Sequence, residues 1–167
     1  MQNIHPLFVH FPIVLALVAV LFELLSLFVK KETLYNMTNG LVILTAIAAV
    51  ATALTGLIAG GSVPHPDEAH PLMDTHKTLE LIGGSLSIVT ALWVVFLNKR
   101  VRVVRTVLIL LTAIVISYGA FYGGRLVYEY GIGTQLVKSG MIDEPGNHSN
   151  MKVQHDSSTE NMGNRAH

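Results

Sequence analysis

Residues 6–29 read PLFVHFPIVLALVAVLFELLSLFV, and this run sets the class of protein. It contains one charged residue, Glu23, and it is long enough to cross a hydrocarbon layer about 30 Å thick, which requires about 20 apolar residues. An ionised carboxylate at that depth is costly unless it is paired or faces protein. The run has no basic segment before it and exceeds the apolar region of a signal peptide, so we expect a retained membrane span.

Three further apolar runs occupy Leu41–Ala59, Leu79–Leu97 and Thr106–Phe121, and the last reaches span length if it continues to Leu126. The whole chain of 167 residues is 51% apolar and 13% charged, whereas soluble domains carry about 25% charge. We therefore predict an all-α, four-transmembrane-helix bundle over residues 1–139. A flexible, polar tail that contains Met and His is expected to follow over residues 140–167.

Composition excludes several classes of function. The formal net charge is zero, so a nucleic-acid binder that depends on excess positive charge is not expected. The chain has no cysteine, which excludes a thiolate metal site, a thioether-linked haem and a cysteine-held iron–sulfur cluster within it.

Charge predicts the orientation of the four spans. The two short connections, 30–40 and 98–105, carry six basic residues and one acidic residue. Because short basic loops stay in the cytoplasm, we expect both termini to lie outside it. All eight histidines then fall on the outer side or in the outer end of a span: His5, His10, His65, His70, His76, His148, His155 and His167.

A proline in the first span and threonines in the second allow predictions about local helix structure. Pro12 lacks a backbone donor and lies one turn inside the first span, so we expect a kink or a late helix start there. In the second span, Thr45, Thr52 and Thr55 are expected to return hydroxyl hydrogen bonds to their own helix.

Our leading hypothesis is that the outer histidines bind haem b and transfer electrons. Such a site needs imidazoles from two facing spans and small residues that make room for the macrocycle. We expect His10 and His76 as axial ligands, His5 and His70 as substitutes, and Arg125 as the partner of a propionate. The alternative without a cofactor is that these histidines only stabilise helix ends.

A metal site is the principal rival hypothesis. His65, His70 and His76, with Asp74 beside them, offer donors that suit zinc, copper or non-haem iron. The tail adds alternating thioether and imidazole donors, Met151 and His155 among them, which suit transient copper capture. An ordinary soluble tail without a ligand is the alternative for that segment.

The motifs also resemble a known family. The residues that carry the resemblance are Ile4-His5-Pro6-Leu7-Phe8-Val9-His10-Phe11-Pro12, then Ala51-Thr52-Ala53-Leu54-Thr55-Gly56, then Gly123-Gly124-Arg125-Leu126-Val127-Tyr128 with Gly131-Ile132-Gly133. Together they resemble the bacterial four-helix membrane domain of unknown function 2231. The resemblance runs from about Ile4 to Leu136, and the tail lies outside it.

The resemblance implies a bacterial protein, and with the orientation that the charges predict we expect a multi-pass protein of the inner membrane with both termini periplasmic or extracellular. Some relatives are joined to cytochrome c-like domains, which implies a redox partner and an electron-transfer setting. The recurring positions of the family fall on His5, Pro6, His10, Pro12, Gly56, His76, Gly124, Arg125, Tyr128 and Gly131. We count Tyr128 with Arg125 among the cofactor-binding residues. We also expect contact with membrane lipid, and small-residue helix faces permit an oligomer.

Overall fold

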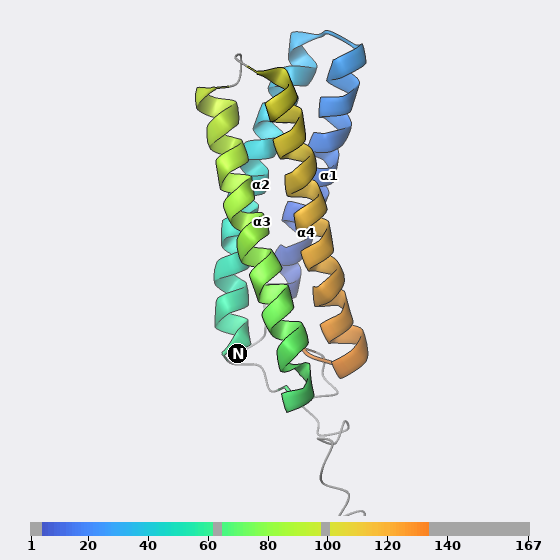
Figure 1. Cartoon of the computed structure of the whole chain (residues 1–167), viewed down its shortest axis with the longest axis vertical. Helices are drawn as coiled ribbons and strands as arrows, with labels where there is room; N and C mark the ends of the chain where they lie inside the picture. Colours follow the sequence, from blue (N-terminus) through green and yellow to red (C-terminus); the bar gives the residue numbers. More distant parts are fainter. Residues whose placement is uncertain (1–4, 62–64, 98–100, 134–167) are drawn as a thin grey trace, which may run out of the picture.

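The computed structural model describes residues 5–61, 65–97 and 101–133. These residues form an antiparallel bundle of four long helices (Figure 1). The helices are α1 (His5–Phe28), α2 (Glu32–Gly60), α3 (His70–Phe96) and α4 (Arg102–Tyr130), and the short 3-10 helix η1 (Asp67–Ala69) precedes α3. The predicted all-α class is confirmed, and the described residues contain no strand. The tail predicted over residues 140–167 lies outside the described ranges.

Each of the four helices is long and apolar enough to span a membrane, as predicted. Three of them begin several residues before their apolar runs: α2 begins at Glu32, α3 at His70 and α4 at Arg102. Polar residues can continue a helix beyond its lipid-facing part, because the backbone hydrogen bonds do not depend on side-chain polarity. An apolar run therefore marks the membrane-embedded part of a helix and not its ends.

Large apolar side chains face outward from the bundle, and small or hydroxyl-bearing side chains fill its interior. Leu17, Ile47 and Ile114 are each more than half exposed. The buried positions include these small and hydroxyl-bearing residues: Ala16, Ala19, Ala46, Ala49, Ala113, Thr45, Thr52, Ser87, Thr90 and Thr112. This distribution suits lipid as the solvent, because helices in lipid associate through close packing of small residues and through interhelical hydrogen bonds.

Pro12 lies within α1, and a side chain of α2 compensates for its missing donor. The helix begins at His5 and continues to Phe28, so the alternative of a late start is wrong. Proline at position 12 leaves the carbonyl of residue 8 without its usual intrahelical N–H. The Thr52 hydroxyl donates to the Phe8 carbonyl across 3.1 Å. The prediction that Thr52 bonds to its own helix was wrong for this reason, whereas Thr45 and Thr55 do so as expected.

The carboxylate of Glu23 is paired inside the bundle. Its Oε2 lies 2.7 Å from Nη2 of Arg105, and both side chains are completely buried. The Thr106 hydroxyl donates to Glu23 Oε1 at 2.7 Å. The guanidinium of Arg105 lies over the Tyr35 ring, 3.7 Å from its centroid. Arg105, which the sequence places in a basic connection, is thus an interior residue that links α4 to α1 and α2.

We predict that Thr52→Val lowers the free energy of unfolding by about 1 kcal/mol, because it leaves the part-buried Phe8 carbonyl without a donor. The double variant Pro12→Ala, Thr52→Val restores an intrahelical N–H to that carbonyl and should recover most of the loss. Unfolding in mixed detergent micelles measures the free energies. Thr45→Val is the matched control, and a full additive loss in the double variant would contradict the assignment.

We predict that Arg105→Met destabilises the bundle by about 3–5 kcal/mol, since it leaves a buried carboxylate without its counter-charge. The double variant Glu23→Met, Arg105→Met removes both charges and should unfold closer to the wild type. The same micelle unfolding assay measures both. Arg125→Met, which breaks an exposed pair, is the control and should have a far smaller effect. Equal losses for Arg105→Met and Arg125→Met would contradict this account.

Candidate metal centre at the histidine end of the bundle

The bundle has two chemically different ends. The connections after α1 and after α3 lie at one end, at the top of Figure 1, and this basic end carries Lys30, Lys31 and Arg102. The start of α1, the link between α2 and α3 and the end of α4 lie at the other end. We call it the histidine end, because the five described histidines lie in or near it: His5, His10, His65, His70 and His76. The structure therefore brings together the histidines that the charge pattern placed on one side.

Three side chains converge at the histidine end. Ligand atoms of His5 (α1), His76 and Glu80 (both α3) all lie within 4.8 Å of one another, and all three residues are half-buried. The two imidazole rings lie edge to face, 6.4 Å apart between centroids. His76 and Glu80 share one face of α3, because residues four positions apart are neighbours on a helix. We call this group the His5–His76–Glu80 cluster.

Hydrogen bonds orient both imidazoles. Nδ1 of His76 lies 2.9 Å from the carbonyl of Gly119 on α4, which can only accept, so this nitrogen carries the hydrogen. Nδ1 of His5 lies 3.2 Å from the hydroxyl of Thr55, which itself donates to carbonyls of α2. These bonds are compatible with Nδ1–H as the donor in His5 as well. In both rings the lone pair is then on Nε2, the arrangement that outer-shell partners impose on metal-binding histidines.

The acceptor atoms of the cluster lie close together without bonding to one another. Nε2 of His76 lies 4.0 Å from Oε2 of Glu80, which is too long for a hydrogen bond. This separation is about twice the 2.0–2.2 Å bond that zinc makes to histidine or to a carboxylate. Glu80 Oε1 is buried and has no hydrogen-bond partner among the described residues. A cation between the lone pairs would stabilise an arrangement that is otherwise unfavourable.

Two glycines make room for the cluster. A Cβ atom at Gly56 would lie 2.9 Å from both His5 Cε1 and Glu80 Oε2. A Cβ atom at Gly123 would lie 2.8 Å from His76 Cε1. Real Cβ atoms essentially never approach other atoms that closely, so both positions require glycine for the observed side-chain placement. At Gly124, next in the chain, an added Cβ would meet nothing within 4 Å.

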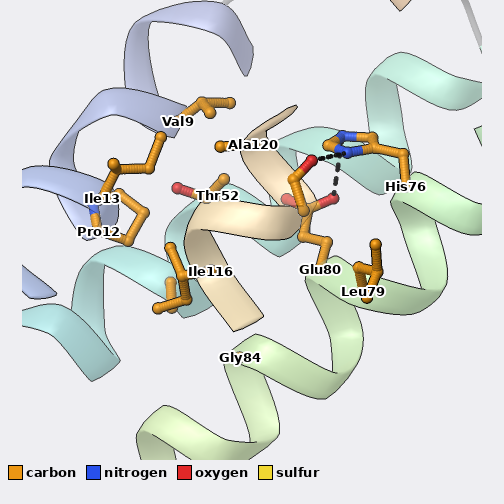
Figure 2. Close-up of a pocket in the computed structure, with 12 residues that line it drawn as sticks. Val9, Pro12, Ile13, Thr52, His76, Leu79, Glu80, Gly84, Ile116 and Ala120 are labelled. Atoms are coloured by element: carbon orange, nitrogen blue, oxygen red, sulfur yellow. Dashed lines mark hydrogen bonds and ion pairs between the residues drawn. The ribbon is translucent and has the colours of Figure 1, made fainter. Parts of the chain in front are cut away.

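A small cavity adjoins the cluster. Its volume is about 40 Å³, and all four helices line it. Figure 2 shows His76 and Glu80 at one side of this cavity, with Val9, Pro12 and Ile13 of α1 at the other. A buried water needs about 10–15 Å³ of such volume, so the space holds a few atoms beside the cluster.

The other predicted site residues lie elsewhere at this end. His10 is exposed, and its Nδ1 lies 2.9 Å from the Pro6 carbonyl of its own helix. His70 is exposed and pairs with His65, with ring centroids 4.9 Å apart, while Asp74 is also exposed. Arg125 binds Glu129 on α4 at 2.6 Å and 3.1 Å, and Tyr128 is 92% exposed. Met151 and His155 lie outside the described residues.

Sequence reasoning selected His5 and His76 as candidates but left out Glu80, Thr55 and Gly119. Glu80 has a signal in the sequence, since it is an acidic residue inside an apolar run and four positions after a histidine. Thr55 and Gly119 have none, because each acts through an atom that approaches its histidine only once the helices have packed.

Comparison with known proteins identifies the family of the chain. No curated protein matches it, and no solved structure matches it. The family described as "Predicted membrane protein (DUF2231)" matches residues 1–136. This match covers the whole four-helix bundle and includes every member of the His5–His76–Glu80 cluster. The chain therefore belongs to the DUF2231 family of membrane proteins, as the sequence motifs predict.

Proposed function

We propose that the protein binds one divalent transition-metal ion in the membrane, through Nε2 of His5, Nε2 of His76 and a carboxylate oxygen of Glu80. The observation that supports this proposal is the convergence of three ligand atoms within 4.8 Å, on side chains whose orientation is set by partners outside the cluster. Two imidazoles and one carboxylate form a donor set that zinc, copper and non-haem iron accept. The function is thus one of metal handling.

Haem b stays a prediction at this end of the bundle. The pocket that adjoins His76 measures about 40 Å³, which is smaller than a macrocycle, and His5 does not line it. His10, the expected second axial ligand, is exposed on α1 and bonds to its own helix. Electron transfer and a cytochrome c-like partner stay predictions that no contact described here supports.

Full-length protein purified in mild detergent, stripped with chelator and titrated with Zn²⁺, should bind one ion per chain with the cluster as its site. Glu80→Gln and His5→Ala each remove a donor and should weaken binding at least about 100-fold, beyond the 10–100-fold that loss of an outer-shell partner costs. Equilibrium dialysis with elemental analysis measures stoichiometry and affinity. Loading at 100 times the dissociation constant should stabilise the wild type by about 2.7 kcal/mol.

Matched control variants test whether zinc binding depends on the cluster or on other residues of the protein. His70→Ala removes an exposed histidine at the same end and should leave binding unchanged. The joint variant Met151→Leu, His155→Ala tests the tail and should also bind normally. Gly123→Ala should weaken binding because its methyl group displaces His76, whereas Gly124→Ala should not. Unchanged zinc binding by Glu80→Gln and His5→Ala would refute the proposed site.

We also propose that the histidine end faces away from the cytoplasm, in the inner membrane of a bacterium. The support is the concentration of Lys30, Lys31 and Arg102 at the opposite end, since basic connections stay cytoplasmic. A reporter that is active only outside the cytoplasm should then be active when fused after Tyr130. The same reporter inserted between Leu97 and Val101 should be inactive. The reverse pattern of activities would invert the proposed orientation.

A further inference from the structure

We infer that the cavity beside the His5–His76–Glu80 cluster admits a small uncharged molecule, of about two or three non-hydrogen atoms, which binds the metal ion directly. This inference rests on the proposed metal site and adds a ligand to it. Dioxygen and nitric oxide are molecules of the required class. We propose binding of this molecule and no chemical change in it.

The three protein ligands leave at least one coordination position of the metal ion open. The protein supplies three ligand atoms, from His5, His76 and Glu80. Tetrahedral and octahedral ions bind four to six ligands, so at least one position remains for an exogenous molecule. Sites with two histidines and one carboxylate are those in which open positions accept small molecules.

The cavity begins at the cluster and extends into the bundle. His76 and Glu80 line the cavity, so an ion held between them lies at its edge (Figure 2). From there the cavity extends along α3 as far as Gly84, one turn beyond Glu80 and deeper in the bundle. An open position that points away from the three protein ligands can therefore face this space.

The wall of the cavity favours an uncharged molecule over a charged one. Most of the wall is apolar and includes Val9, Ile13, Leu79 and Ile116. The one hydroxyl in the wall, that of Thr52, already donates its hydrogen to the Phe8 carbonyl. A charged molecule would lose its hydration without gaining partners, which is costly, whereas an uncharged one loses little. The pocket is half-open, and its inner space of about 40 Å³ suits an occupant of a few atoms.

Gly84 offers a way to fill the cavity from a position that is not a member of the cluster. It lines the cavity, and a Cβ atom added there would meet nothing within 4 Å. A leucine at this position would therefore occupy the part of the cavity in which we place the small molecule. Gly40 is the matched control, because an added Cβ also meets nothing there and because this glycine lies towards the basic end of α2.

The test uses full-length protein loaded anaerobically with Fe²⁺ and exposed to nitric oxide. Elemental analysis counts bound iron, and electron paramagnetic resonance counts the iron–nitrosyl complex. We expect about one nitrosyl per bound iron in the wild type and in Gly40→Leu. In Gly84→Leu we expect the same iron content and a nitrosyl signal reduced at least 10-fold. Ala120→Val, which fills the cavity from α4, provides a second variant with the same expected loss.

The outcomes separate this inference from the proposed function. Iron binding without a nitrosyl signal in the wild type would overturn the inference and leave the metal site intact. An undiminished signal in both Gly84→Leu and Ala120→Val, with normal iron content, would also overturn it, because the molecule would then bind outside the cavity. Absence of bound iron in the wild type, together with absence of bound zinc, would refute the metal site itself.

Discussion

Polar groups buried in a lipid-embedded bundle must find their partners within the protein, because no water is present to satisfy them. Several interior groups of this protein follow that constraint. Thr90 and Thr112 share a hydrogen bond of 2.9 Å between α3 and α4, and their hydroxyls also contact carbonyls one turn back in their own helices. The Phe8 carbonyl that Pro12 deprives of a donor receives one from Thr52. The contact between α1 and α2 therefore arises where α1 cannot satisfy its own carbonyl.

The two interior carboxylates meet this constraint in opposite ways. Glu23, towards the basic end, has a guanidinium, a hydroxyl donor and complete burial. Glu80, at the histidine end, faces two imidazoles whose hydrogens are directed elsewhere, and its Oε1 finds no partner among the described residues. The first arrangement is electrostatically complete and holds three helices together. The second gathers ligand atoms of three residues without such a partner, and this difference is why the histidine end and not the basic end is the candidate functional site.

The sequence predicts the number and class of helices well, because an apolar run of this length indicates a membrane-spanning helix. It predicts the candidate site only in part. His5 and His10 are five residues apart, and at about 100° per residue their side chains point about 140° apart around α1. Only one of them can face the interior, and the choice depends on how α1 rotates against α2. Arg105 illustrates the same limit, since its charge suggests a loop while packing places it in the core.

The hydrogen bond between Thr52 and the Phe8 carbonyl also has a geometric consequence for the cluster. It lies one turn from the contact between His5 and Thr55, and the two contacts join the same pair of helices. Together they fix how far α1 can slide along α2. A slip by one turn would carry the His5 imidazole about 5.4 Å along the axis, out of reach of His76. A proline that interrupts the hydrogen bonding of one helix thereby sets the register in which two imidazoles from different helices can meet.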